Sequence, residues 1–433
     1  MLSCPWRFCH VRTEVLAVNP SLTRYRPYRP RFPVGMRPLP SSPRPPSAQH
    51  AAGSLQQPEP GRFTVGLEEE MFLVDAGTLD CVERMPGAFL ADAKAMLGDR
   101  VKREIISSMI ELVTRPSNDL SAVAAELVSL RASLAATAHA HGLALLACGT
   151  HPFSDWRQQT LTAKPRYDLV AGSLGSLSTR IHLCGLHIHV AVPDAEQRIS
   201  VMNRLQQFLP LFLALSTSSP FWRGAPTGLK SYRSAANDET PRTGLPTRFN
   251  DAGEFDRYVD KLTAAGFIPD QTFLWWAIRP SLKYPTLELR ISDCCTDWRD
   301  AIAIAALYRC LVHALTLDPT ICDTWEDHYY LVNLENRWQA IRYGLDATVL
   351  DPVTGKVQPM RRCVREMVAR LAPGAKALGC NAELRDVLRI LEIGTSAERQ
   401  TVMHEVAVDR GAGPLEAMRL VAAGIANETL AAA

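Results

Sequence analysis

The 433-residue sequence lacks the short signatures by which many nucleotide- and metal-using proteins are recognised. It contains neither a phosphate-binding P-loop nor a GxGxxG turn. Its eleven cysteines show no CxxC spacing of the kind that holds structural zinc. No stretch of about 20 uninterrupted apolar residues is present. These absences argue against a P-loop nucleotidase, a Rossmann dehydrogenase, a zinc ribbon and a transmembrane protein.

Positive charge is concentrated at the start of the chain. Residues 1–60 contain eight arginines and two acidic residues, and the whole chain has a net charge of +2, which leaves about −4 for residues 61–433. A nucleic-acid binder carries a basic stripe on its folded domain, so we expect no nucleic-acid partner. Scattered, unpaired cysteines and the lack of a membrane span predict a cytoplasmic protein with reduced thiols.

Residues 1–60 also hold twelve of the thirty prolines, and such a composition cannot form a packed core. We predict a disordered Pro/Arg-rich extension at 1–60 and a single domain at 61–433, with a helical C-terminal part from about 350. The extension is either a partner-docking tail or a dispensable leader with Met36 as an alternative start, and we favour the leader. Deleting it is expected to leave activity and thermal stability intact.

Acidic residues interrupt the first strand-like segment, which spans residues 64–75. Side chains alternate along a strand, so Glu68 and Glu70 share one face, opposite Val65 and Leu67. Unpaired buried carboxylates are destabilising, and the pair therefore indicates a cation, an arginine or exposure at a cleft. The alternative is a solvated strand face with three glutamates.

Three later strand-like segments repeat this pattern. They carry Glu111 in 104–114, His187 and His189 in 179–192, and Glu288 and Arg290 in 286–293. Two histidines on one face of an apolar strand favour a metal or phosphate contact over isolated core histidines. If one sheet gathers all four strands, the site is rich in oxygen ligands and suits Mg²⁺ or Mn²⁺. Acids around Mg²⁺, with arginines nearby, can hold ATP without a P-loop.

Hydrophobic periodicity predicts a layered α/β fold whose sheet has one polar, concave face. The expected helices lie at about 119–141, 194–217, 251–266, 297–317, 333–344, 357–372, 381–393, 396–409 and 414–430, and further strands at 143–150 and 272–278. The long connection at 219–250 is expected to cover an active site.

Six runs, in the same order as in a known family, together resemble the carboxylate–amine ligase branch of the type 2 glutamate–cysteine ligases. They are residues 65–75, 109–114, 184–190, 231–234, 287–293 and 335–347. The resemblance implies a glutamine-synthetase-like α/β (α+β) fold, in which a curved, largely antiparallel sheet forms a funnel backed by helices. It also implies that residues 61–433 are a catalytic ligase domain that uses ATP with Mg²⁺ or Mn²⁺.

The same resemblance implies a two-step reaction. A carboxylate of glutamate, or of a similar acid, takes the γ-phosphoryl group of ATP, and the amine of cysteine, or another amine, then displaces phosphate. The products would be γ-glutamylcysteine, ADP and phosphate. The implied metal ligands are Glu68, Glu70, Glu111, His187 and Glu288; the implied catalytic residues are Arg233 and Arg290, which with Arg337 and Arg342 would also bind the cofactor.

The sequence leaves two other function classes open. It also leaves open whether the protein forms a homodimer. A metal-dependent hydrolase of the amidohydrolase type also carries HxH on a strand, but there the motif lies near the start of a barrel, whereas more than a hundred residues precede it here. A non-catalytic nucleotide-binding relative is the second alternative, and the presence of every acid named above argues against it.

Overall fold

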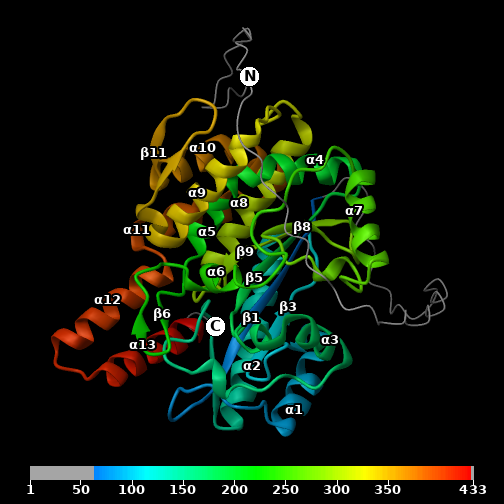
Figure 1. Cartoon of the computed structure of the whole chain (residues 1–433). Coiled ribbons are helices and arrows are strands. Elements are labelled where there is room, and N and C mark those ends of the chain that lie inside the picture. The colour runs from blue at the N-terminus through cyan, green and yellow to red at the C-terminus, as the bar shows by residue number, and fades with distance from the viewer. Residues whose placement is uncertain (1–62, 431–433) are drawn as a thin grey trace, which may run out of the picture. The chain divides into compact units, whose positions relative to one another are not determined.

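The structure, a computed structural model, describes residues 63–430, and the expectations for residues 1–60 lie outside the described part. Strand β1 (Val65–Asp75) lies at the centre of a seven-stranded sheet (Figure 1). The other strands of this sheet are β2 (Val101–Arg103), β3 (Met109–Val113), β4 (Leu143–Leu146), β5 (Gly185–Ala191), β8 (Ile278–Pro280) and β9 (Thr286–Asp293). The strand order is β2-β3-β1-β5-β9-β8, with β4 also beside β1.

Every pairing in this sheet is antiparallel. β1 is paired on both edges. β3 pairs with one edge, and on the other edge β5 pairs with the N-terminal half of β1 and β4 with its C-terminal end. Two short hairpins lie outside the sheet: β6 (Phe221–Trp222) with β7 (Ala225–Pro226), and β10 (Thr348–Leu350) with β11 (Val357–Pro359). The predicted largely antiparallel sheet is thus present.

Helices pack around the sheet and form the C-terminal part of the described chain (Figure 1). They are α1 (Gly87–Leu97), α2 (Leu120–Ala140), α3 (Pro165–Leu174), α4 (Ala195–Leu205), α5 (Leu209–Ser216), α6 (Tyr232–Asn237), α7 (Ala252–Ala264), α8 (Trp298–Leu317), α9 (Asp327–Tyr343), α10 (Met360–Leu378), α11 (Asn381–Ile393), α12 (Ser396–Asp409) and α13 (Pro414–Leu430). Two of them begin at aspartate N-caps: Asp119 accepts a hydrogen bond from the Ser121 amide and Asp297 one from the Arg299 amide.

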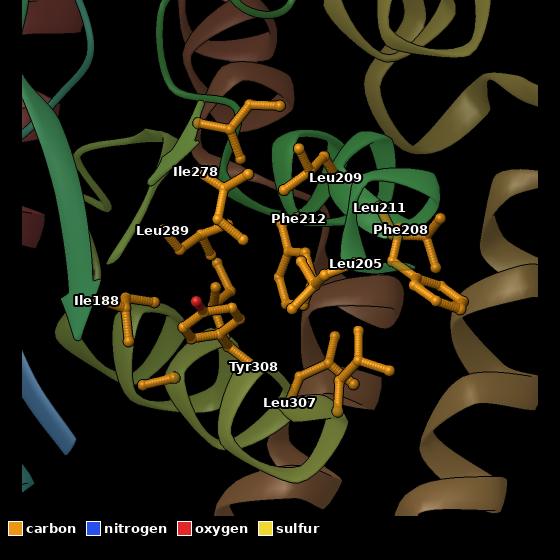
Figure 2. Packing of buried hydrophobic residues seen from close by; sticks show 14 of the residues in the cluster. Ile188, Leu205, Phe208, Leu209, Leu211, Phe212, Ile278, Leu289, Leu307 and Tyr308 are labelled. Carbon is orange, nitrogen blue, oxygen red and sulfur yellow. The ribbon is translucent and has the colours of Figure 1, made fainter. Parts of the chain in front are cut away.

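The main hydrophobic core lies on the apolar face of the sheet. Figure 2 shows Ile188 and Leu289, from β5 and β9, beside Tyr308 of α8 and Phe212 of α5. The Tyr308 hydroxyl donates to the Leu287 carbonyl oxygen at 3.2 Å, so α8 is anchored directly to the sheet. With one face covered in this way, the opposite face of β1, β5 and β9 is left for polar side chains.

A second cluster of buried apolar residues surrounds the C-terminal half of β1, with β4, α1 and α13. Phe72 belongs to it, although Phe72 alternates onto the same face as Glu68 and Glu70. The ring of His182 lies edge-on to Phe72, with ring centroids 4.7 Å apart. The polar stretch of β1 therefore ends at Glu70.

Several predicted elements are wrong in their extent. The strands expected at 104–114 and 179–192 are shorter, at Met109–Val113 and Gly185–Ala191, and the helices expected at 333–344 and 357–372 are longer, at Asp327–Tyr343 and Met360–Leu378. The helix expected at 194–217 divides into α4 and α5 around a 3₁₀ turn at Gln206–Phe208, because Pro210 has no amide proton and its ring crowds the carbonyl of Gln206. The strand expected at 272–278 is absent from the described structure: a 3₁₀ turn capped by Asp270 occupies Gln271–Phe273, and β8 begins only at Ile278. The connection at 219–250 contains α6 and the β6–β7 hairpin.

Two helices, α2 and α8, are long and apolar enough to cross a membrane by length and composition alone. In α8, 78% of the apolar window is buried inside the protein, as in the core helix of a globular fold. Helix α2 packs against α8, α1 and the sheet. Burial accounts for the apolar character of α8, whereas 39% of the apolar window of α2 is buried.

Candidate active site

A cavity of about 430 Å³ lies against the polar face of the sheet. Its floor comes from β1, β3, β5 and β9, the four strands whose acids and histidines were predicted to meet. Its remaining walls come mainly from α3, α6 and the segment 271–284, with further residues from 104–105, 181–183, 240–244 and α9. The volume lies within the range of small-molecule sites, and the number of charged side chains in the walls favours a charged ligand.

Strand register explains why these side chains meet. Glu70 lies opposite Glu111, Glu68 opposite His187, and His189 opposite Glu288. Directly opposite residues of an antiparallel pair project to the same face with Cβ atoms about 5 Å apart. One row of ionisable groups therefore crosses the sheet from β3 to β9.

Two groups in this row have ligand atoms close enough to share a cation. Glu68, Glu111 and His187 form one, and Glu68, His189 and Glu288 the other; within each, the ligand atoms all lie within 4.8 Å of one another. The Nε2 atom of His189 is buried without a hydrogen-bond partner, while its Nδ1 atom lies 2.9 Å from the Thr286 hydroxyl. An oriented imidazole with a free nitrogen facing carboxylates suits a metal ligand.

The protonation states of the ionisable groups in this row follow from their burial and from the charges of their neighbours. Burial opposes the charge on Glu68, but the nearby imidazoles of His187 and His189, whose nitrogens lie 3.5 and 3.8 Å from its carboxylate oxygens, hold the pKa of its carboxyl well below the ordinary value. Burial and the charge of Glu68 raise the pKa of Glu111 well above its ordinary value. Burial and the charge of Glu70 raise the pKa of Glu104 to about 8. The metal-free chain thus holds protons that a divalent cation would displace.

Glu288 is held in its charged form by two arginines. Burial alone would raise its pKa, but Arg279 and Arg290 lower it. Arg279 makes two contacts, from Nε to Oε2 at 2.9 Å and from Nη2 to Oε1 at 3.3 Å. Arg290 donates to Oε1 of Glu288 through Nη1 only, and its Nε is buried without a partner. Arg290 therefore has donor capacity left on the cavity wall.

Arg233 reaches the cavity from α6 and is braced by β9. Its Nη1 and Nη2 atoms donate to the carbonyl oxygens of Ile291 and Arg290, each at 3.3 Å, and Nη1 lies 3.8 Å from Asp293. A Cβ atom on Gly185 would come within 2.3 Å of Nη2, so the guanidinium occupies the space that a side chain at position 185 would need. The glycine of the Gly185-Leu186-His187 run thus permits the position of Arg233.

The family model for glutamate-cysteine ligase family 2 matches residues 64–415 of the chain. The chain belongs to this family. It is 43% identical over 341 residues to a Bradyrhizobium sp. (strain BTAi1) protein named "Putative glutamate--cysteine ligase 2", covering 78% of this chain and 82% of that protein. A protein of the same name from Rhodospirillum rubrum is 42% identical over 342 residues, covering 78% and 88%.

Two solved structures share the fold. A glutamate–cysteine ligase from Francisella tularensis, in complex with AMP, superposes with a TM-score of 0.62 at 12% identity, covering 86% of this chain and 89% of that one. A bifunctional glutathione synthetase from Pasteurella multocida superposes with a TM-score of 0.60 at 13% identity. The match covers 84% of this chain and 52% of that one. The predicted fold class, with a helix-backed antiparallel sheet and a helical C-terminal part, is confirmed.

The cavity gathers most of the residues that the family resemblance singled out. Its walls include Glu68, Glu70, Glu111, His187, Glu288, Arg233, Arg290 and Arg337. Arg342 is not among the wall residues; its guanidinium donates to the Gly228 carbonyl oxygen on an exposed surface. Arg337 pairs with Asp238 at 2.7 and 2.9 Å, so its charge is already matched within the protein. The roles of these residues stay predictions.

The sequence also contains wall residues that pattern reasoning did not select. Glu104, Tyr167 and Arg279 line the cavity, and Lys102 lies outside the wall with its Nζ 3.1 Å from Glu111. Lys102 is recognisable only from the register, which sets it opposite Glu111. Arg279 follows the same rule, since it lies opposite Glu288. Both pairs join strands that are consecutive in the chain, but the register between two strands depends on the turn that connects them, and alternation within one strand does not give it.

Glu69, between the two cavity glutamates, faces the other way and is completely buried. Arg131 of α2 makes two 2.8 Å contacts with its carboxylate. Arg131 also donates to the carbonyl oxygens of Cys295, Thr296 and Thr429. The alternative of three solvated glutamates is therefore wrong, because Glu69 belongs to a buried ion pair that ties β1 to α2 and α13.

Proposed function

We propose that the chain is an ATP-dependent carboxylate–amine ligase that joins glutamate, or a similar acid, to cysteine or another amine. The observation that carries the proposal is the row of carboxylates and histidines across four strands, bordered by Arg233 and Arg290 at a cavity of about 430 Å³. The family membership supports the same class of reaction.

The residues of the row fit Mg²⁺ or Mn²⁺. One ion would be held by Glu68, Glu111 and His187, and a second by Glu68, His189 and Glu288. Glu70 accepts a hydrogen bond from the Gly185 amide at 2.6 Å, which fixes its carboxylate beside the first group. Divalent cations, when bound, neutralise the triphosphate and withdraw charge from its oxygens.

Arg290 and Arg233 have different parts in this proposal. Arg290 keeps an unpaired Nε and a second terminal nitrogen beside the row, so it can hold charge that develops on a transferring phosphoryl group. Arg233 is held by β9 carbonyl oxygens, and a rigid guanidinium can orient a carboxylate or phosphate by two parallel hydrogen bonds. Positioning two reactants in one cavity lowers the entropic part of the barrier.

The buried His187 imidazole suits this role in its neutral form. Burial and the Arg290 charge lower the pKa of His187. A neutral imidazole offers a lone pair to a cation, whereas an imidazolium cannot. His187 should therefore stay available as a ligand at slightly acidic pH, and the proton on Glu111, which a cation must displace, should weaken cation binding as the pH falls. A cytoplasmic location is part of the proposal, because the cytosol keeps cysteine thiols reduced and contains the soluble substrates.

The decisive experiment is an ADP-release screen of amino-acid pairs, run with Mg²⁺ and with Mn²⁺. A ligase releases ADP only when acid and amine are both present, and glutamate with cysteine is the first pair to test. The Glu405→Gln variant, which changes an exposed carboxylate on α12, serves as the matched control for glutamine substitutions in the row. ATP-independent cleavage of amides would replace the proposal with a hydrolase, and an ATP-dependent thermal shift without ADP would replace it with a nucleotide-binding protein.

A further inference from the structure

Two buried thiols lie next to each other far from the cavity floor. The sulfur atoms of Cys310 and Cys380 are 3.6 Å apart, although the residues are separated by 70 positions in the sequence. Cys310 lies within α8, and Cys380 is the N-cap of α11. Both side chains are fully buried in the main hydrophobic core.

The backbone around both residues is held in place. Gly379, with φ of +69°, ends α10 in the left-handed conformation and turns the chain into Cys380. The Cys380 amide donates to the Ala375 carbonyl oxygen at 2.9 Å, and the Leu384 amide donates to the Cys380 carbonyl oxygen at 3.0 Å. Cys310 is fixed by the regular hydrogen bonding of α8. The two thiols therefore face each other across a rigid helix contact.

The surroundings distinguish the two thiols chemically. The hydrogen bond from Cys310 lowers the pKa of the Cys380 thiol, and the Arg309 guanidinium acts in the same direction. The same hydrogen bond, together with burial, raises the pKa of Cys310. Arg309 is held beside them by its bond to the Leu378 carbonyl oxygen at 3.3 Å. Cys380 is thus the residue that becomes a thiolate first, and the thiolate is the reactive form.

We propose that Cys310 and Cys380 are a reversible disulfide site that fastens the start of α11 to α8. A disulfide bond is about 2.05 Å long, so the two sulfur atoms, now 3.6 Å apart, must approach by about 1.5 Å. The alternative use of these residues is as two small apolar groups that fill the core and never react.

The oxidant in this proposal is a peroxide, small and neutral enough to enter the helix contact. The Cys380 thiolate attacks one peroxide oxygen, the O–O bond breaks, and Cys380 becomes a sulfenic acid while hydroxide leaves and takes the proton lost from the thiol. The Cys310 sulfur then attacks the sulfenic sulfur, and water leaves with the Cys310 proton. Two thiols and one hydrogen peroxide give one disulfide and two waters, and a dithiol reductant reverses the change.

The bond would close a long loop between the sheet-backing helix and the C-terminal helices. A crosslink that spans many residues restricts the unfolded chain and so raises stability. Helix α8 packs on the face of β5 and β9 opposite the cavity. The oxidised protein is therefore expected to gain several degrees in melting temperature with little change in ligand binding at the cavity.

The test treats the full chain with hydrogen peroxide well below its melting temperature. Intact mass, peptide mapping under non-reducing conditions and melting temperature are then measured before and after addition of dithiothreitol. The expected result is a loss of about 2 Da, a linked peptide pair containing Cys310 and Cys380, and a rise in melting temperature that dithiothreitol abolishes. The Cys310→Ser and Cys310→Ala variants should lose all three, whereas Cys363→Ser, which removes a half-buried thiol on α10, should retain them.

Three results would overturn the proposal. First, the wild-type protein could stay reduced under conditions that oxidise a solvent-exposed dithiol peptide. Second, the disulfide could map to another pair of cysteines. Third, the Cys310–Cys380 disulfide could form and leave the melting temperature unchanged or lower it. The wild-type mapping decides the matter even if both Cys310 variants fail to fold.

Discussion

Replacing Arg290 with lysine should separate the two roles that its position allows. If Arg290 only neutralises Glu288, lysine should serve, because it retains the positive charge and Arg279 still contacts both carboxylate oxygens. If Arg290 holds charge on the transferring phosphoryl group, lysine should fail, since an ammonium does not reproduce the planar set of donors. The unpartnered Nε favours the second role.

The expected size of the effect follows from the second role. Loss of one donor to a transition state costs about 10² to 10³ in rate, or roughly 3 to 4 kcal/mol. We expect Arg290→Lys to fold with a near-normal melting temperature, to bind Mg-ATP somewhat more weakly and to lose most of its acid- and amine-dependent ADP release. The matched control is Arg362→Lys, an exposed arginine paired with Glu366 on α10. Turnover within about threefold of wild type, less than 1 kcal/mol, would refute the reasoning and make Arg233 the better candidate.

Three further predictions concern the metal row, the buried ion pair and acid stability. Glu70→Gln, which keeps the shape and removes a charge, should abolish Mg²⁺-dependent ATP binding measured by calorimetry while the fold survives; unchanged affinity would remove Glu70 from the site. Arg131→Met should lower the free energy of unfolding by about 3 to 5 kcal/mol in urea titrations, because it leaves the Glu69 charge buried and unpaired; a loss below about 1 kcal/mol would contradict that account. Burial lowers the pKa of His151 to about 4 and of His182 to about 3, so the folded chain excludes protons that the unfolded chain binds below pH 6.5, and stability falls as the pH drops. Between pH 7.5 and 5 each histidine should account for about 2 kcal/mol of that fall, and His182→Gln should lose correspondingly less; an unchanged pH dependence would show that His182 is not buried in its neutral form.

Local pattern was sufficient to predict the segments that carry the row. Alternation in 64–75 and 286–293 matched β1 and β9, because a strand with one buried face imposes its period on the sequence. The meeting of Glu68, Glu111, His187 and Glu288 in one cavity could be expected only with the added assumption that one sheet holds all four strands, and the family resemblance supplied that assumption.

The pattern within one segment failed where residues of another segment decide the environment. Glu69 is as acidic as its neighbours, and only Arg131, 62 positions away, makes its burial tolerable. Lys102 and Arg279 became site neighbours through strand register. The strand expected at 272–278 failed for a different reason: its apolar residues fill the core from a turn, and an apolar run alone does not distinguish the two.

The central place of β1 has a consequence for how the chain is made. In the described part of the chain β1 is the first strand, and its Val65–Glu69 edge waits for β5, since Gly185, whose amide bonds to Glu70, is 115 residues further along than Glu70. At about 5 to 20 residues per second, that interval lasts about 6 to 23 s. Until β5 is made, the N-terminal half of β1 presents unpaired backbone groups on this edge, whereas its C-terminal end can already pair with β4. Nascent chains of this protein are therefore most in need of chaperone protection between the synthesis of β3 and that of β5, and a cluster of slow codons placed there would prolong the exposure.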